Sequence, residues 1–293
     1  MPLTPPRPLT RRGFLRGTLL AGAALGAAGA SLRAEPQPSS PSPGSPPPNS
    51  PPPGSPQPGP ADPKLIEDLV AANRILVDQG VLDGYGHVSA RHNLDPRYYL
   101  MSRSLAPELV TAGDLLVHDL DGNVAGFQGV ALYLERFIHG EIYRARPDVF
   151  AIAHSHSPSV VPFGVSGVPL RPIYHMSAFL GGPVPVFAIR AVDGPSDMLV
   201  RSPALGRALA RTLGTHPVAL LRGHGAVVVG PDLPHAVFRS VYTEMNARLQ
   251  AQAMSLGRKV TYLDPEEAKR AEASLDQTLR RPWELWRRKA LGK

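Results

Sequence analysis

Two histidines end an apolar segment in the middle of this 293-residue chain. The segment DVFAIAHSHS covers residues 148–157, and its apolar residues are typical of a buried strand. His154 and His156 are two residues apart, so both imidazoles project from the same face of such a strand. Imidazole nitrogens bind a metal ion at about 2.0–2.1 Å, and this spacing lets two rings reach one ion. The pattern by itself is also typical of two polar residues at the edge of a sheet.

A third histidine stands at the break between two apolar runs in PVALLRGHGAVVVG. His224 lies between Gly223 and Gly225, and a glycine on each side allows the backbone to turn tightly. A solvent-exposed turn histidine is the alternative interpretation. If both apolar runs are strands, His224 lies near the same sheet edge as the other two histidines.

A carboxylate completes the possible ligand set. Glu135 borders the apolar stripe of an expected helix over about residues 132–146, where a surface carboxylate is not expected. The alternative is a helix salt bridge with Arg136 or His139. Three histidines and a carboxylate suit a divalent cation with an exchangeable position, first Zn²⁺ and otherwise Mn²⁺ or Fe²⁺.

The rest of the pattern predicts the elements that must position these residues. Asp62-Pro63 begins a helix that Gly80 ends, because a capping side chain and a proline favour a helix start. Strands are expected at 87–91, 98–102, 115–119, 149–153 and 184–189 and on both sides of residues 223–225, with further helices at about 203–213, 234–257 and 265–280. Strands and helices are intermixed, so we expect an α/β domain in which helices cover a mixed sheet.

Composition excludes several classes of protein. The chain has no cysteine, so any metal site must be built from histidines and carboxylates. The formal net charge is +7, but five arginines lie in the first 34 residues, and the remainder is nearly neutral. This charge balance argues against a nucleic-acid partner. The basic C-terminal segment LRRPWELWRRKALGK predicts a solvated helix face or a subunit contact.

The first 61 residues differ in character from the rest. The segment TRRGFLR at residues 10–16 resembles the bacterial twin-arginine export motif, and a short Ala- and Gly-rich run follows it. We therefore expect residues 1–34 to be an export signal. Once it is removed, the mature protein is expected to be periplasmic and to have no stable membrane span. Thirteen of residues 36–60 are proline, so residues 35–61 are expected to be a disordered linker. Residues 62–293 then form one catalytic domain.

Three segments in fixed order resemble the class II aldolase/adducin family: GYGHVSARH, LERFIHGEIYRARPDVFAIAHSHS and LLRGHGAVVVG. The resemblance covers about residues 62–260. It implies a three-layer α/β/α domain whose central mixed sheet is largely antiparallel. It also implies that His154, His156 and His224 are zinc ligands, with Glu135 as a fourth ligand or general base. Members of this family are commonly homotetramers with sites between subunits.

The chain departs from the family's aldolases where these bind a substrate phosphate. It has His87 in place of an asparagine, MSRSLAPELVT in place of a glycine-containing loop, and Tyr133-Leu134 in place of a serine pair. A phosphate dianion needs several N–H and O–H donors, so these changes disfavour a sugar-phosphate aldolase. His87 is predicted to contact the substrate instead.

Other residues at these places suit a carboxylic acid. Ser102 and Arg103 could bind a carboxylate, because the planar guanidinium matches it. Tyr174 and His175 in RPIYHMSAF could serve an aromatic or keto-acid substrate, with His175 as a catalytic residue. The combined pattern resembles the family's decarboxylase-like branch, which includes dihydroxyphthalate decarboxylases.

The expected function is a metal-dependent carbon–carbon lyase, a decarboxylase or an aldolase. Its substrate would be a non-phosphorylated hydroxy-aromatic acid or a keto or hydroxy carboxylic acid. A divalent ion would stabilise the developing enolate, and Glu135 would move the proton. The alternatives are a sugar-phosphate aldolase or epimerase, and an Fe(II) oxygenase on the same scaffold.

Overall fold

The computed structural model describes residues 58–124 and 129–292. The export signal expected at residues 1–34 lies outside the described residues, as does all of the expected linker except its last four residues. The described helices and strands are α1 (Pro63–Asp78), β1 (His87–Arg91), β2 (Tyr98–Ser102), β3 (Leu115–Asp119), α2 (Arg136–Ala145), β4 (Ala151–Ser155), α3 (Val161–Val165), β5 (Val186–Phe187), α4 (Arg190–Asp193), α5 (Pro203–Leu213), β6 (Val218–Leu221), β7 (Gly225–Gly230), α6 (Leu233–Ser255), α7 (Pro265–Asp276) and α8 (Arg280–Ala290). Short 3-10 helices occur at Pro107–Leu109, Ala112–Asp114 and His175–Leu180.

Seven strands form one sheet in the order β3-β2-β1-β4-β7-β6-β5. Every neighbouring pair is antiparallel except β5 and β6, which are parallel. The sheet is therefore mixed, as the order of elements predicts, and largely antiparallel, as the family resemblance implies. β1, β4 and β7 lie side by side at its centre, and they come from three segments far apart in the chain.

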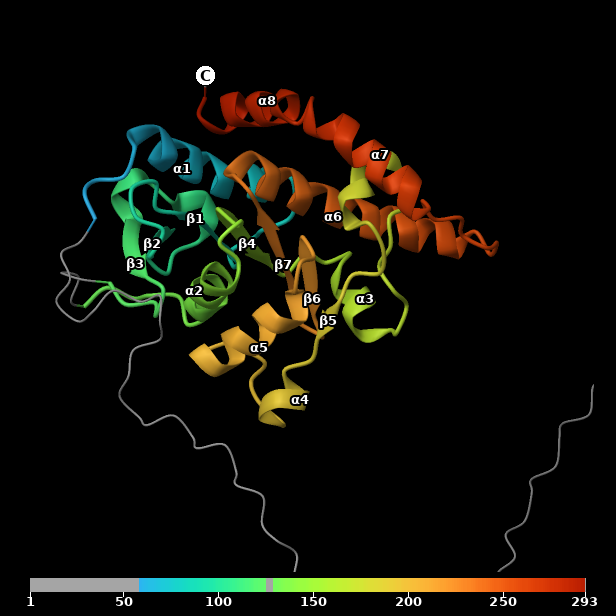
Figure 1. Ribbon diagram of the computed structural model, residues 1–293, viewed down its shortest axis with the longest axis horizontal. Coiled ribbons are helices and arrows are strands. Elements are labelled where there is room, and N and C mark those ends of the chain that lie inside the picture. Colours follow the sequence, from blue (N-terminus) through green and yellow to red (C-terminus); the bar gives the residue numbers. More distant parts are fainter. Residues whose placement is uncertain (1–57, 125–128, 293) are drawn as a thin grey trace, which may run out of the picture. The chain divides into compact units, whose positions relative to one another are not determined.

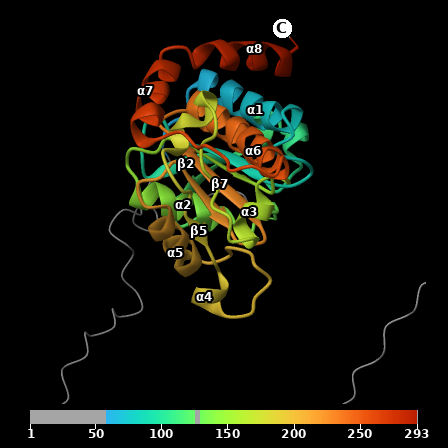
Figure 2. The same ribbon diagram turned by 90° about the vertical axis from the view of Figure 1, so that its right-hand side faces the viewer.

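Helices cover both faces of the sheet, which gives three layers. In Figure 1, α1 and α6 lie above the sheet and α2 and α5 below it, and Figure 2 shows the same layers from the side. Alternate residues of β7 supply the two faces: Val227 and Val229 pack with α2 and α5, and Val228 packs with Phe238 of α6. The predicted three-layer α/β/α class is confirmed.

The helix starts follow from short-range chemistry. The Asp62 side chain accepts a hydrogen bond from the Lys64 amide at 2.8 Å, directly before Pro63. The side chain of Asp232 accepts one from the His235 amide in the same way, at 2.8 Å. Each cap satisfies an amide that has no partner inside its helix, so each helix begins where the sequence predicts.

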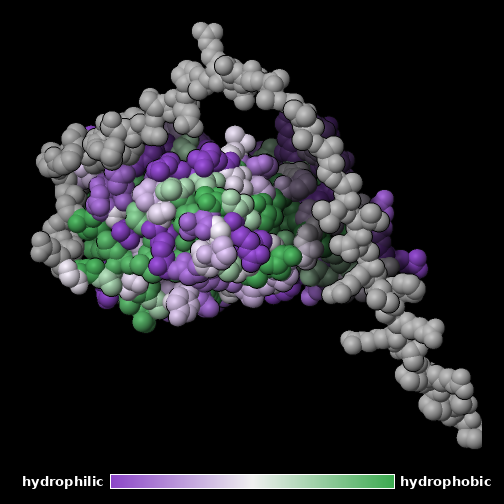
Figure 3. Space-filling model, turned by 90° about the horizontal axis from the view of Figure 1, so that it is seen from below, coloured by the Kyte–Doolittle hydropathy of each residue, from purple (hydrophilic) through white to green (hydrophobic). Residues whose placement is uncertain are grey.

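The basic C-terminal segment forms α8, which packs against α1. Trp283 is buried there, and Arg287 forms ion pairs with Asp68, at 2.6 Å, and with Glu67. The predicted solvated helix face is therefore only part of this segment's role, because one side of α8 belongs to the fold. No helix of the described residues is long and apolar enough to cross a membrane. Seen from below, the surface mixes apolar and hydrophilic areas (Figure 3).

The loop between β6 and β7 depends on its two glycines. Gly223 has φ +66°, a left-handed conformation that favours glycine. At Gly225 an added Cβ would lie 1.9 Å from the carbonyl oxygen of Ser155 on β4. The two strands can approach this closely only because position 225 has no side chain, so this glycine fixes the distance between the loop and the end of β4.

Gly225→Ala should therefore destabilise the domain by about 2–3 kcal/mol, the usual cost of forcing extra volume into a packed interior. Chemical denaturation would measure the loss. Gly182→Ala is the matched control, because no atom lies within 4 Å of an added Cβ there, and it should stay close to wild type. Equal stabilities of the two variants would contradict the close-approach argument.

Candidate metal centre

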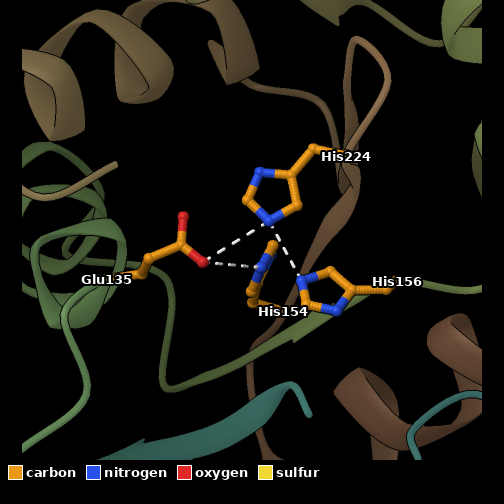
Figure 4. Close-up of side chains that lie close together, drawn as sticks. All are labelled: Glu135, His154, His156 and His224. Atoms are coloured by element: carbon orange, nitrogen blue, oxygen red, sulfur yellow. Dashed lines mark hydrogen bonds and ion pairs between the residues drawn. The ribbon is translucent and has the colours of Figure 1, made fainter. Parts of the chain in front are cut away.

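Glu135, His154, His156 and His224 converge at one end of the central strands (Figure 4). Each residue offers one ligand atom, and these four atoms all lie within 4.8 Å of one another. Nε2 of His156 is 3.0 Å from Nε2 of His224. Oε2 of Glu135 lies 3.4 Å from Nε2 of both His154 and His224. The four residues chosen from the sequence are thus brought together.

These distances suit a common metal ion. Two ligand atoms at tetrahedral angles and about 2.0–2.1 Å from zinc lie about 3.3 Å apart. The cluster also holds buried nitrogens without a hydrogen-bond partner, namely Nε2 of His154 and Nδ1 of His224. A buried imidazole nitrogen without a partner is costly, and a metal ion would satisfy the one on His154. The residues present therefore fit a divalent cation.

The sheet aligns the histidines. His154 pairs with Val227 across the β4–β7 ladder, and its Nδ1 lies 3.1 Å from the carbonyl oxygen of Ala226. A carbonyl can only accept, so Nδ1 carries the hydrogen and Nε2 keeps its lone pair. The lone pair faces the cluster, and the backbone fixes the ring orientation that a metal ligand needs.

Glu135 reaches the cluster from the residue directly before α2, which corrects the expected position inside a helix. The apolar stripe is shorter than predicted, because Leu134 is 55% exposed. The Val200 amide donates a hydrogen bond to Oε1 of Glu135 at 2.8 Å, which leaves Oε2 for the histidines. A carboxylate at the start of a helix is also stabilised by the helix dipole.

The surroundings favour the protonation states that a metal site needs. Burial would raise the pKa of Glu135, but the imidazoles of His154 and His224 hold this pKa well below the usual range. Burial, together with the neighbouring His154 and His224, lowers the pKa of His156 to about 4. At neutral pH the cluster therefore offers a carboxylate and, at His156, a neutral imidazole.

A cleft of about 390 Å³ adjoins the cluster. Glu135, His154 and His156 line it, as do His87 and Tyr133, whose ring centroids are 4.6 Å apart. The other lining residues are Gly84, Tyr85, Gly86, Ser104, Leu105, Ala106, Leu134 and Leu199. The lining thus combines aromatic and aliphatic groups with the polar groups of the cluster.

The predicted substrate residues divide into two groups. His87 lines the cleft, whereas Ser102 is buried behind it, and its hydroxyl lies 3.5 Å from that of Tyr133. Arg103 forms an ion pair with Asp114, with 2.7 Å between Nε and Oδ1, and does not line the cleft. Ser102 thus supports the cleft wall, and Arg103 belongs to the surface beside it.

Tyr174 and His175 lie elsewhere in the chain. Tyr174 precedes the 3-10 helix that His175 begins, and its ring lies 6.5 Å from that of Tyr242 on α6. His175 is exposed, and neither residue lines the cleft of the same chain. Within one chain the structure does not bring them to the candidate metal centre.

Sequence reasoning missed most of the cleft wall. Leu199 carries no motif that marks it, and the Val200 amide is 65 residues from its partner Glu135. Tyr85 lies in the segment GYGHVSARH but was not selected as a site residue. Tyr133 could have been found, because it stands where the family's aldolases have a serine. Its hydroxyl donates to the carbonyl oxygen of Leu105, which fixes the loop after β2.

The geometry agrees with comparisons to known proteins. Residues 67–251 match the Class II Aldolase and Adducin N-terminal domain. The chain is 36% identical over 247 residues to decarboxylase tropJ of Talaromyces stipitatus, covering 75% of this chain and 92% of that protein. It is 32% identical over 206 residues to a 3,4-dihydroxyphthalate decarboxylase of Arthrobacter keyseri, covering 65% and 79%. The chain belongs to the class II aldolase and adducin family.

Solved structures show the same fold. L-fuculose 1-phosphate aldolase from Glaciozyma antarctica superposes with a TM-score of 0.65 at 26% identity, over 78% of this chain and 88% of that one. An aldolase II superfamily protein from Pseudomonas syringae gives a TM-score of 0.66 at 23% identity, over 79% and 94% of the two chains. The decarboxylase relatives, together with the likeness to L-fuculose 1-phosphate aldolase, support a lyase.

The buried histidines around the cluster make stability depend on pH. Burial lowers the pKa of His139 well below its usual value, and nearby His154 and His118 lower it further. Between the folded and unfolded pKa values only the unfolded chain binds the proton, so stability falls as pH drops below about 6.5. Urea unfolding of metal-free protein should show this loss, at up to about 1.4 kcal/mol per pH unit for each such histidine.

His139→Gln removes one of these groups and keeps a polar side chain at its place. Its unfolding free energy should therefore fall less steeply between pH 6.5 and 5 than that of wild type. Identical slopes for the two proteins would show that His139 does not stay neutral in the folded state.

Proposed function

We propose that this protein is a metal-dependent decarboxylase of a non-phosphorylated hydroxy-aromatic or keto/hydroxy carboxylic acid. The observation that carries the proposal is the convergence of three histidines and Glu135 beside a cleft. Glu135, His154 and His156 line this cleft together with aromatic and aliphatic residues. The decarboxylase relatives support the reaction type. The substrate class rests on the chemistry of the cleft.

The donor set suits Zn²⁺ first, with Mn²⁺ or Fe²⁺ as alternatives. Such an ion would act as a Lewis acid and stabilise the electron pair that stays on the substrate when CO₂ departs. His154, His156, His224 and Glu135 would hold it. The Ala226 carbonyl keeps His154 oriented, and the Val200 amide keeps Oε1 of Glu135 occupied. Loss of either contact would loosen the ligand set without touching the substrate.

The chain's own groups can carry out the remaining tasks. In a state in which Glu135 does not hold the ion, its ionised Oε2 can accept a proton from a substrate hydroxyl and return it to the carbon. Leu105, Leu134 and Leu199 line the cleft and can exclude water around an aromatic ring. The ring of Tyr133, which lies beside His87, can pack against the aromatic ring of the substrate and hold it in place.

The first test combines metal analysis with an assay of CO₂ release from a panel of hydroxy-aromatic and keto acids that includes 3,4-dihydroxyphthalate. Purified wild type should contain about one zinc or manganese ion per chain, and His154→Ala should lose it. Glu135→Gln should lower kcat by roughly 10²–10⁴-fold, as expected for loss of a general acid/base. Turnover that survives in Glu135→Gln with the metal retained would refute the acid/base role.

The same measurements separate the alternatives. The likeness to L-fuculose 1-phosphate aldolase keeps aldol cleavage open, and release of an aldehyde without CO₂ would favour it. Iron in the purified protein together with oxygen uptake would favour an Fe(II) oxygenase. No stoichiometric metal in wild type, with His154→Ala unchanged, would mean that these histidines are polar residues at a strand end.

We further propose a homotetramer whose sites lie between subunits, as the family resemblance implies. This arrangement would give Tyr174 and His175 a role in a neighbouring subunit's site, because they do not line the cleft of their own chain. Exposed apolar side chains such as Val186 and Val192 support subunit contact.

Subunit complementation tests this arrangement. His175→Ala and Glu135→Gln should each be nearly inactive alone. When the two variants are unfolded together and refolded as a mixture, some sites combine an intact Glu135 with an intact His175, so activity should return in part. A mixture no more active than its components, in a protein that light scattering shows to be tetrameric, would rule out the shared site.

A further inference from the structure

A chain of buried hydrogen bonds runs from the cleft into the core. Nδ1 of His87 lies 2.7 Å from Nε2 of His139, and Nδ1 of His139 lies 2.6 Å from Oγ of Ser89. Oγ of Ser89 is 2.7 Å from the hydroxyl of Tyr143, which lies 3.3 Å from the carbonyl oxygen of Phe150. All four side chains are buried, with exposed fractions of 3% or less.

The secondary structure accounts for the chain. His87 and Ser89 are two residues apart on β1 and face the same side of the sheet. His139 and Tyr143 are four residues apart on α2 and face the strand from one side of that helix. The chain therefore zigzags between two elements that pack together, and no surface group takes part in it.

Only two directions of hydrogen bonding are possible, and the Tyr143 hydroxyl decides between them. In one direction Tyr143 donates to the Phe150 carbonyl, Ser89 donates to Tyr143, and His139 donates from Nδ1 to Ser89. His87 then donates from Nδ1 to His139, so its Nε2 keeps a lone pair. In the other direction every donor is reversed, and Nε2 of His87 carries a hydrogen.

The first direction makes one more hydrogen bond than the second. The Phe150 carbonyl can only accept, so it can be used only when Tyr143 donates to it. It has room for that bond, because it accepts just one other hydrogen bond in the described residues, from the Arg91 amide at 2.7 Å. Burial raises the pKa of Tyr143, so the hydroxyl keeps the hydrogen that the argument needs.

We propose that this chain holds His87 with its hydrogen on Nδ1 and a lone pair on Nε2, so that the cleft accepts a hydrogen bond from a substrate hydroxyl. His87 is the group that touches the substrate, and His139, Ser89 and Tyr143 are positioning residues. An anionic oxygen at the same place meets the lone pair and is repelled. The substrate is therefore a hydroxylated carboxylic acid, and a second carboxylate is disfavoured at this place.

The inference concerning the substrate rests on the proposed function, whereas the ring tautomer does not. Long-range ¹H–¹⁵N spectra of zinc-loaded protein with labelled histidines distinguish a protonated from an unprotonated ring nitrogen. The resonances of His87 are assigned from their loss in His87→Asn. Wild type should show Nδ1 protonated and Nε2 unprotonated in both His87 and His139.

Tyr143→Phe removes the end of the chain and keeps the ring volume. Ser89 then has His139 as its only partner and donates to it, so both histidines should change to the reversed tautomer. Tyr99→Phe is the matched control. Tyr99 is also buried and lies beside the hydrogen-bonded chain, with 5.4 Å between its ring centroid and that of Tyr143. Its hydroxyl donates to the Arg136 carbonyl and not to the chain, so the tautomers should stay as in wild type.

Binding of two probes measures the consequence for recognition. Wild type should bind 2,3-dihydroxybenzoate more tightly than phthalate. In Tyr143→Phe the affinity for phthalate relative to 2,3-dihydroxybenzoate should rise about tenfold. Ser89→Ala breaks the chain at another point and should shift the ratio in the same direction, whereas Tyr99→Phe should not. These titrations use the zinc-loaded protein without turnover.

Two results would overturn the inference: a hydrogen on Nε2 of His87 in wild type, or an unchanged tautomer in Tyr143→Phe. Failure to bind zinc or to release CO₂ would instead overturn the proposed function. The tautomers would still be readable in that case, so the two failures are distinguishable.

Discussion

The close pairing of β4 with β7 is the contact on which the rest of the site depends. His154 and His156 lie at the end of β4, and His224 lies in the turn that leads into β7, so only this pairing can bring the three rings together. Gly225 permits the approach because its backbone fits against the Ser155 carbonyl. The position of the ligand set therefore follows from backbone geometry, and the side chains add direction.

Direction comes from groups outside the ligand set. The Ala226 carbonyl fixes the ring of His154, and the Val200 amide fixes one oxygen of Glu135. Both contacts use backbone atoms: Ala226 lies in β7, and Val200 lies in the segment that leads into α5. A cluster of buried imidazoles and a carboxylate would be costly to assemble without such partners, because each polar group loses its water. The folded core thus provides the orientation that a metal ion needs.

The sequence predicted the bounds of several strands and selected four residues that the fold brings together, for a physical reason. Alternation and turn residues mark β1, β2 and β3, and their predicted bounds agree with the structure. β4 begins two residues later than predicted and includes His154, because ladder pairing continues past the last apolar residue. Glu135 lies in the cluster, as expected, but it was placed inside a helix, since sequence periodicity does not show where the first helical turn begins. The Val200 amide and the wall residue Leu199 could not be predicted, because only the folded chain brings them to residues more than sixty positions away.

The segment His87-Val88-Ser89-Ala90-Arg91 shows how one strand serves both the core and the site. Val88 and Ala90 pack beneath α1, while the three polar residues face α2 on the other side of the sheet. Arg91 there donates to the carbonyl oxygens of Pro96, Tyr143, Arg146 and Val149, so its guanidinium joins the end of α2 to the start of β4. Tyr143 is thereby held from two sides, by Arg91 at its backbone and by Ser89 at its hydroxyl. A buried polar row is stable only when every member has a partner, and here the last partner is a cleft residue, His87. The packing of β1 against α2 and the chemistry at the cleft are therefore set by the same hydrogen bonds, and neither can change alone.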